Sequence, residues 1–208
     1  MSAFLLLAVL AQAPGPLPPT TRADAHFVVG WQNLHQPQPL DHYNEWVNGI
    51  FYGGAGGGWY WTDHLKTQID FGAGTRGEQY RTRQVPVGGL QAYESSRLSV
   101  SQQSVAIGQQ YQFFRNQWFH PHVGVGADVA HQNISEAFQP LVVYDSPVTR
   151  QIRPAHTEDS HRVITRPFGE AGFKGYLTPR AFFTGDVRIM FRHGIDEVLF
   201  RAGFGIDF

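Results

Sequence analysis

The chain has 208 residues, a length that fits a single domain, and it contains no cysteine. The absence of cysteine excludes disulfide frameworks, thiolate catalysis and cysteine-ligated metal sites. Its 16 lysines and arginines nearly balance its 17 aspartates and glutamates, so the net charge indicates neither a nucleic acid nor an acidic surface as a partner.

The N-terminal segment has the pattern of a secretory signal. Residues 3–11 form a short apolar run, and Ala11-Gln12-Ala13 matches the small-residue cleavage pattern that follows such runs. The run is too short to cross a bilayer, which takes roughly 20 residues in a helix. We therefore expect residues 1–13 to be a signal peptide, residues 14–25 a proline-rich periplasmic leader, and residues 26–208 the folded domain.

Beyond the leader, apolar and polar residues alternate, which is the period of a β-strand. No later segment is long and apolar enough for a membrane-spanning helix, so a membrane protein with this sequence must be a β-barrel. The alternation predicts eight strands, at residues 27–33, 47–60, 65–76, 98–113, 118–129, 163–177, 181–192 and 197–208.

The predicted connections differ in length on the two ends of the strands. Long polar loops are expected near residues 34–46, 77–97 and 130–162, and short turns at residues 61–64, 114–117 and 178–180. This asymmetry is typical of outer-membrane barrels, whose short turns face the periplasm. The seventh connection, at residues 193–196, is short although it falls on the outer end.

The last strand carries the clearest signal. Every second residue from Val198 to Phe208 is apolar, and the residues between them are mostly small or charged. Such a wall fits lipid on one side and a polar interior on the other. A terminal aromatic residue on such a strand resembles the assembly signal of bacterial outer-membrane barrels, so we expect Phe204, Ile206 and Phe208 to be read by the barrel-assembly machinery.

Two segments extend the resemblance over most of the mature chain. The glycine-rich run at residues 53–58 with the aromatic residues that follow it, and the segment 119–128, are similar to the small outer-membrane barrels of the OmpA-transmembrane and OmpX-like type. The resemblance implies an all-β fold, an eight-stranded antiparallel up-and-down transmembrane barrel in the bacterial outer membrane. It also implies a monomer in contact with outer-membrane lipid and lipopolysaccharide, and it specifies no chemistry.

Charged residues occupy the alternate strand positions whose side chains face the barrel interior. Eight strands enclose little more than the space that side chains fill, so opposite charges there are expected to pair and to close the lumen. Carboxylates in such a network could be mistaken for acid/base pairs, but the structural interpretation is the simpler one. The predicted lumen network comprises Lys66, Asp70, Asp128, Glu170, Lys174, Asp186, Arg188 and Arg201.

Aromatic residues near predicted strand ends fit the girdles that such barrels place at the lipid headgroups. Trp59, Tyr60, Trp61 and Trp118 are the expected interfacial aromatics.

No motif indicates a catalytic residue, a metal or a cofactor. The glycine run matches neither the phosphate-binding nor the dinucleotide-binding pattern. His120 and His122 share a strand face with Asp128 and could supply metal ligands, although interior hydrogen bonding is the simpler role. None of the histidines is followed two residues later by serine, the pair that a resemblance to the lipid A deacylases would require.

The sequence therefore favours a non-catalytic outer-membrane barrel with a filled lumen, an envelope structural or surface-contact protein that needs no cofactor. Three alternatives stay open: a lipid A-modifying enzyme, a narrow channel, and a periplasmic lipocalin-like ligand binder.

The terminal aromatic residue generates a first prediction. Deleting Phe208, or replacing it with a charged residue, should impair assembly because the terminal signal is then lost. Outer-membrane fractionation and gel electrophoresis with and without heating measure this. A variant that still fractionates with the outer membrane as a heat-modifiable band would contradict the assignment of the signal.

Overall fold

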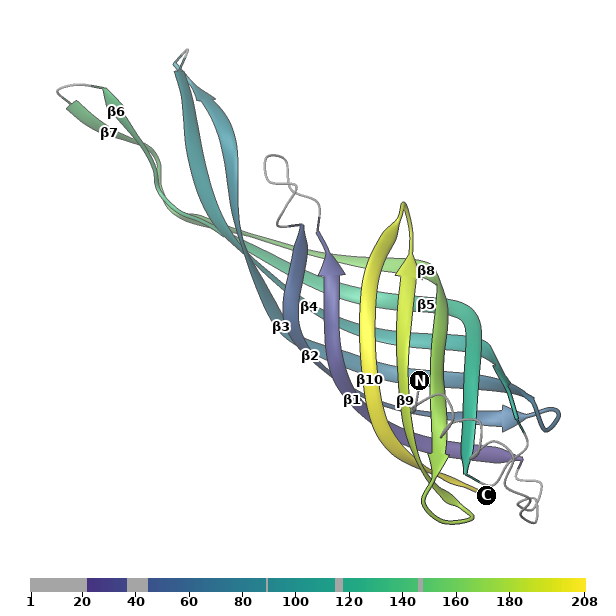
Figure 1. The fold of residues 1–208 in the computed structure, drawn as a ribbon. Coiled ribbons are helices and arrows are strands. Elements are labelled where there is room, and N and C mark those ends of the chain that lie inside the picture. The colour runs from purple at the N-terminus through teal and green to yellow at the C-terminus, as the bar shows by residue number, and fades with distance from the viewer. Residues whose placement is uncertain (1–21, 37–44, 89, 115–117, 146–147) are drawn as a thin grey trace, which may run out of the picture.

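The computed structural model describes residues 22–36, 45–88, 90–114, 118–145 and 148–208, so the expected signal peptide and most of the leader lie outside the described residues. Eight antiparallel strands close into a barrel in the order β1-β10-β9-β8-β5-β4-β3-β2 (Figure 1). The predicted fold class is confirmed. The barrel strands are β1 (Ala23–His35), β2 (Trp46–Tyr60), β3 (Leu65–Val87), β4 (Leu90–Gln112), β5 (Phe119–Phe138), β8 (His156–Tyr176), β9 (Ala181–Phe191) and β10 (Ile195–Asp207).

The ring is closed by pairing between the first and the last strand. The β1–β10 ladder runs from Asp24 opposite Asp207 to Leu34 opposite Glu197. Closure leaves no sheet edge along this part of the barrel, so its backbone donors and acceptors are paired within the protein. Among the described residues, no helix is long and apolar enough to cross a membrane.

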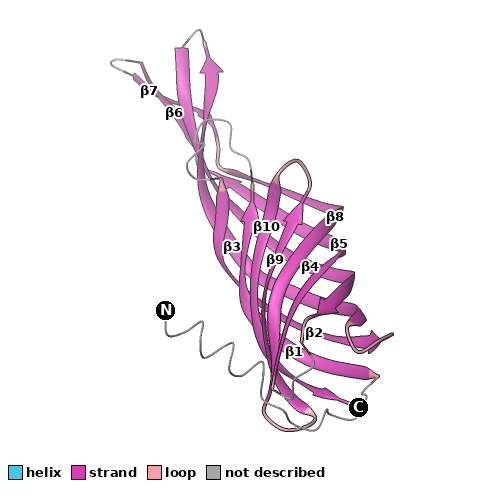
Figure 2. Ribbon diagram, turned by 45° about the vertical axis from the view of Figure 1, so that its right-hand side comes forward, coloured by secondary structure: helices cyan, strands magenta, loops and turns pink. Residues whose placement is uncertain are grey.

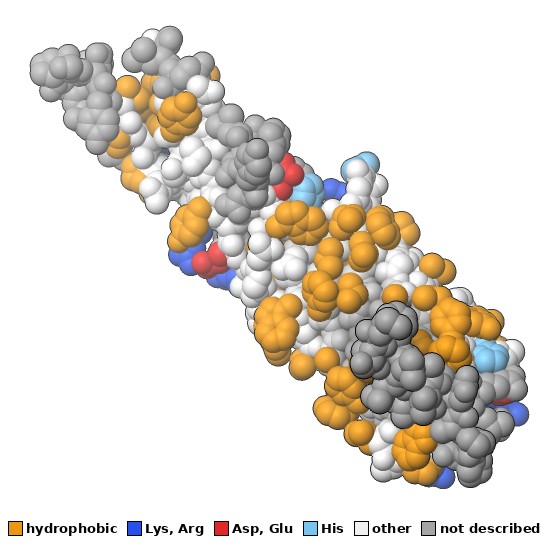
Figure 3. Space-filling model, viewed as in Figure 1, with side chains coloured by type: hydrophobic (Ala, Val, Ile, Leu, Met, Phe, Trp, Pro, Cys, Tyr) orange, Lys and Arg blue, Asp and Glu red, His pale blue; other side chains and the backbone are white. Residues whose placement is uncertain are grey.

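The barrel wall is apolar outside and polar inside. Along β10, Phe204 and Ile206 are exposed, whereas Arg201 and Asp207 are buried. Figure 3 shows apolar side chains gathered over the visible part of the barrel wall. A soluble barrel distributes its residues the other way, so this wall is built to face hydrocarbon.

The prediction of two of the long loops is wrong. The segments 77–97 and 130–162 are not loops, because β3 and β4 remain paired as far as Val87 opposite Leu90, and β5 and β8 as far as Phe138 opposite His156. A separate hairpin, β6 (Leu141–Asp145) and β7 (Val148–Arg153), follows β5.

We call the continuation of β3, β4, β5 and β8 beyond the barrel, together with the β6–β7 hairpin, the extension (residues 77–88, 90–101, 133–145 and 148–161). It rises obliquely from one side of the barrel in both ribbon views (Figures 1 and 2). Both faces of these strands carry polar residues, which hid their alternation in the sequence.

A β-bulge in β3 also obscured the pattern. The pairing with β4 shifts between Gly74 and Gly77, and the two bulged residues, Thr75 and Arg76, are both exposed. The shift reverses which parity faces inward, as bulges do. Where the extension leaves the barrel, an apolar cluster lies on its inner side; it comprises Leu34, Val47, Ile50, Leu98 and Val100.

Two of the three predicted short turns, at residues 61–64 and 178–180, are confirmed, and most of the third, at residues 114–117, lies outside the described residues. Leu177 N–H donates to Ala181 O at 2.9 Å across the turn before β9, and Trp61 N–H donates to Leu65 O at 2.9 Å before β3. The seventh connection is confirmed as short, since β9 ends at Phe191 and β10 begins at Ile195.

The apolar wall generates a second prediction. Val125 is 66% exposed near the middle of the apolar part of β5. Val125→Arg should lower the free energy of unfolding by about 2–4 kcal/mol in lipid vesicles, because a cation then lies near the bilayer midplane. Ser135→Arg is the matched control on the same strand and face, in the extension, and should cost at most about 0.5 kcal/mol. Equal effects of the two changes would contradict a lipid-facing wall at Val125.

Candidate functional site: the lumen and its charge clusters

Alternate positions of the barrel strands place charged side chains in the lumen. All eight residues that parity predicted to face inward are buried there: Lys66, Asp70, Asp128, Glu170, Lys174, Asp186, Arg188 and Arg201. The register places them at successive levels between the short turns and the extension, where they form three clusters with other residues.

The short-turn cluster comprises Asp24, Tyr60, Lys66, Lys174 and Asp207. Asp24 Oδ2 accepts hydrogen bonds from Lys66 Nζ at 3.1 Å and from Lys174 Nζ at 3.0 Å. Lys174 Nζ also donates to Asp207 Oδ1 at 2.6 Å, and Tyr60 Oη donates to Asp24 Oδ2 at 2.9 Å. Two ammonium groups thus neutralise two carboxylates contributed by strands from opposite ends of the chain.

The central cluster comprises Asp70, Glu170, Asp186, Arg188 and Arg201. Arg188 donates to Glu170 Oε2 from Nε at 3.0 Å and from Nη2 at 2.7 Å, and it also pairs with Asp70. Arg201 Nε donates to Asp186 Oδ1 at 2.8 Å, and its Nη1 donates to Asp70 Oδ2 at 3.0 Å. The cluster joins β3, β8, β9 and β10 across the lumen.

The outer cluster is centred on Arg166, whose side chain is fully buried. Arg166 Nη2 lies 2.8 Å from Asp128 Oδ2 and 2.8 Å from Glu197 Oε2, and its Nη1 lies 2.8 Å from Asp196 Oδ2. Gln102 Nε2 donates to the same Glu197 oxygen at 2.9 Å. One guanidinium thus serves three carboxylates at the level where the extension begins.

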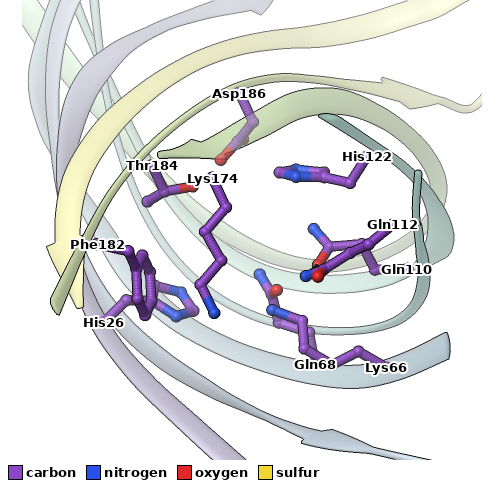
Figure 4. Close-up of a pocket in the computed structure, with 10 residues that line it drawn as sticks. All are labelled: His26, Lys66, Gln68, Gln110, Gln112, His122, Lys174, Phe182, Thr184 and Asp186. Atoms are coloured by element: carbon purple, nitrogen blue, oxygen red, sulfur yellow. Dashed lines mark hydrogen bonds between the residues drawn. The ribbon is translucent and has the colours of Figure 1, made fainter. Parts of the chain in front are cut away.

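Between the short-turn and central clusters the lumen contains a cavity of about 10 Å³, the smallest space that one water occupies. Figure 4 shows Lys174 reaching across it from β8, with the Phe182 and His26 side chains on one side and Gln68 on the other. Lys174 Nζ lies 3.7 Å from the centre of the Phe182 ring, a cation–π contact. His26 Nε2 lies 2.9 Å from Asp70 Oδ1 and links the cavity wall to the central cluster.

Several network members were missed by sequence reasoning. Arg166 and Glu197 lie on predicted strands with the inward parity, so the rule that found their neighbours also applied to them. Asp24 and His26 were missed because the first strand was expected to begin at residue 27, and it begins at Ala23.

The predicted aromatic girdle needs one correction. Trp59, Trp61 and Trp118 are exposed on the outer wall, but Tyr60 points into the lumen, where it bonds Asp24. Strand geometry requires this, because neighbouring residues of a strand face opposite sides. The predicted assembly residues Phe204, Ile206 and Phe208 are all exposed on the outer wall.

The two histidines considered as metal ligands lie at the short-turn end of β5. His122 is buried beside the small cavity, and the His120 ring packs against Tyr176 at 5.2 Å. Within the part of the chain that the structure describes, no group of three or more histidine or carboxylate side chains could hold a metal ion.

Comparison with known proteins rests on structure. No protein-family model and no curated protein sequence matches the chain. Several solved structures are similar over nearly the whole fold, among them the following three. The outer membrane protein OprG from Pseudomonas aeruginosa has a TM-score of 0.54 at 13% identity, covering 92% of this chain and 99% of that chain. Neisserial surface protein A has a TM-score of 0.52 at 12% identity, covering 89% and 96%.

The third is Ail, the attachment invasion locus protein of Yersinia pestis, with a TM-score of 0.50 at 10% identity, covering 90% of this chain and 99% of that chain. The chain is thus a transmembrane β-barrel with the fold of the small eight-stranded outer-membrane proteins of the OmpA/OmpX-like type. Its exposed apolar wall is the surface that contacts membrane lipid.

The outer cluster generates a third prediction. Arg166→Leu should lower the free energy of unfolding by about 3–5 kcal/mol, because it leaves buried carboxylates without a counter-charge. Urea unfolding of the refolded protein in vesicles measures this. Arg180→Leu, at an exposed turn, is the control and should change stability by no more than about 0.5 kcal/mol. A similarly small effect of Arg166→Leu would contradict the role of Arg166 as the counter-charge of these carboxylates.

Proposed function

We propose that the protein is a non-catalytic, monomeric barrel that closes its own lumen and holds the extension outside the outer membrane as a contact surface. The observation that carries this proposal is the lumen itself, whose charged groups are bonded to one another at three successive levels. The barrel-assembly machinery inserts the chain, and lipopolysaccharide is its neighbour in the outer leaflet.

The filled lumen argues against a channel. Ions need a continuous hydrated path, and the space beside Lys174 is about 10 Å³. Opening it would require long side chains such as Arg188 and Arg201 to leave buried carboxylates, which is strongly unfavourable. The apolar outer wall argues in the same way against a soluble lipocalin-like binder, because that surface would then face water.

The lumen chemistry argues against an enzyme. The His26–Asp70 pair has the arrangement of a general base and the group that orients it, but Asp70 is also bonded to Arg188, Arg201 and Gln68. The Thr184 hydroxyl, which lines the same cavity as His26, donates instead to the backbone oxygen of Phe173 at 3.2 Å, and a nucleophilic mechanism needs a hydroxyl or thiol bonded to the histidine. The pair is also buried, so a lipid substrate in the bilayer cannot reach it.

The extension supplies the contact surface. Tyr80 and Tyr93 are 69% and 66% exposed on its outer face, and tyrosine is enriched in binding surfaces because it combines a rigid ring with a polar tip. The ladder between β3 and β4 holds both rings on a paired sheet. A surface ordered in this way loses less conformational entropy on binding than a flexible loop does.

Planar-bilayer recording tests the closed lumen. Purified protein should show no large, stable conductance, because paired side chains fill the barrel. A porin added to the same membrane is the positive control. Reproducible openings of porin size would contradict the proposal and support the channel alternative.

Mass spectrometry of lipid A tests the non-catalytic role. Strains with and without the gene should show the same lipid A species. A change in acyl chain number that the wild-type gene restores would contradict the proposal and support the enzyme alternative.

A further inference from the structure

The sheet of the extension divides into two hairpins. The ladder between β4 and β5 reaches Ser96 opposite Phe138, and a main-chain bond from Gln139 N–H to Ser95 O at 2.9 Å follows it. Beyond that bond, within the described residues, β4 pairs only with β3, and β6 pairs only with β7. The β3–β4 and β6–β7 hairpins diverge in both ribbon views, and we call them the prongs of a fork (Figures 1 and 2).

Each prong has a free strand edge. In the described part of the chain, residues 90–95 of β4 have β3 on one side only, and β6 has β7 on one side only. Main-chain donors and acceptors along a free edge can pair with an added strand. Side chains stand out from the faces of a sheet, so they do not fill the space along its edge. An extended segment between the prongs can therefore pair with both of them.

Two guanidinium groups meet at the base of the fork. Arg83 on β3 lies directly opposite Glu94 on β4, and its Nε donates to Glu94 Oε2 at 2.6 Å. Arg153 on β7 donates from Nη1 to the two oxygens of the same carboxylate at 3.1 and 3.2 Å. We call Arg83, Glu94 and Arg153 the clamp. It joins the two prongs and carries one net positive charge.

The clamp turns its positive groups outward. The Glu94 side chain is fully buried, whereas those of Arg83 and Arg153 are 39% and 41% exposed. The bonds to Glu94 use Nε and Nη2 of Arg83 and Nη1 of Arg153. Nη1 of Arg83 and the Nε and Nη2 of Arg153 can therefore bond a second anion. Planar guanidinium groups suit a carboxylate because their donors match its two oxygens.

An aromatic contact holds Arg83 in place. The guanidinium carbon of Arg83 lies 4.3 Å from the centre of the Phe138 ring, and the His156 ring stacks on Phe138 at 4.7 Å. Phe138 itself is buried. An arginine that is already ordered loses less side-chain freedom when it binds an anion.

The other carboxylates of this face have partners of their own. Glu136 lies 3.9 Å from a guanidinium nitrogen of Arg81, and Glu158 lies 3.5 Å from His156 Nε2. Asp145 is the last residue of β6, at the tip of its prong. An anion at the base of the fork therefore meets the positive charge of the clamp that Glu94 leaves uncompensated.

We propose that the fork binds an extended acidic segment of another protein. The segment lies as a strand between β4 and β6, and one of its carboxylates bonds Arg83 and Arg153. The inference deepens the proposed contact role of the extension, and it rests on that role for access from outside the cell.

A protein segment suits the fork better than a small anion or an anionic polysaccharide does. A half-exposed ion pair contributes about fivefold in affinity or less, so the clamp alone holds a small anion weakly. A polysaccharide can meet the clamp, but it does not match the alternating donors and acceptors of two strand edges. An extended acidic peptide supplies both kinds of contact.

Fluorescence anisotropy of labelled peptides with the folded, detergent-solubilised protein tests the site. The probe is a short peptide in which glutamate alternates with threonine. One control peptide has glutamine in place of glutamate, and the other keeps glutamate but is N-methylated at every second main-chain nitrogen. Each control should bind at least about fivefold more weakly than the probe. Equal binding of the glutamine peptide would overturn the clamp, and equal binding of the N-methylated peptide would overturn the strand pairing.

Two variants locate the binding at the clamp. Arg83→Gln and Arg153→Gln should each lower the affinity for the probe by about fivefold, because half of the clamp is then lost. Arg97→Gln is the matched control, since Arg97 is also half-exposed and paired with a carboxylate, that of Glu78, but lies on the opposite face of β4. An equal loss with Arg97→Gln would overturn the site. The heat-modifiable band shows which variants are folded, and either clamp variant tests the site if the other does not fold.

The remaining outcomes separate the ligand class and the proposed function. Labelled dextran sulfate that binds more tightly than the probe, and loses affinity with the same clamp variants, would overturn the choice of a protein segment. A silent bilayer recording with no binding of the probe would overturn this inference alone. A conducting barrel that binds the probe through the clamp would overturn only the sealed-barrel proposal.

Discussion

The rest of the structure depends on the hydrogen-bonded closure of β1 against β10. A backbone donor or acceptor left unpaired in hydrocarbon costs several kcal/mol, so a sheet in the membrane must close on itself. Closure at eight strands leaves an interior that side chains fill, and alternation sends every second side chain into it. Polar residues are excluded from the lipid-facing wall and are therefore brought together inside the barrel, where each charge needs a partner.

The charge clusters answer that requirement by joining strands that are not neighbours. Lys174 on β8 meets Asp24 on β1, and Arg188 on β9 meets Asp70 on β3. These contacts cross the lumen, so they brace the barrel against flattening as well as neutralising charge. Beyond the barrel, β3, β4, β5 and β8 stay paired with one another, so one sheet continues from the apolar wall into the polar extension.

The sequence predicted most of the barrel because alternation is strong where one face is apolar, as in residues 181–192 and 197–208. Parity then identified eight lumen charges, although which of them pair depends on contacts between distant strands. The extension was misread as loops because both of its faces are polar and the bulge at Thr75 and Arg76 reverses the parity. Tyr60 was misplaced because aromatic composition was weighed above the alternation that separates it from Trp59 and Trp61.

The most direct test of a barrel that spans the outer membrane with its extension outside is the labelling of single cysteines. The chain has none, so Tyr93→Cys in the extension and Arg180→Cys at a short turn each introduce one thiol. A maleimide coupled to a polymer too large to pass porins should label Tyr93→Cys on intact cells. It should label Arg180→Cys only after the outer membrane is permeabilised. Labelling of Arg180→Cys on intact cells, with Tyr93→Cys protected, would contradict the account.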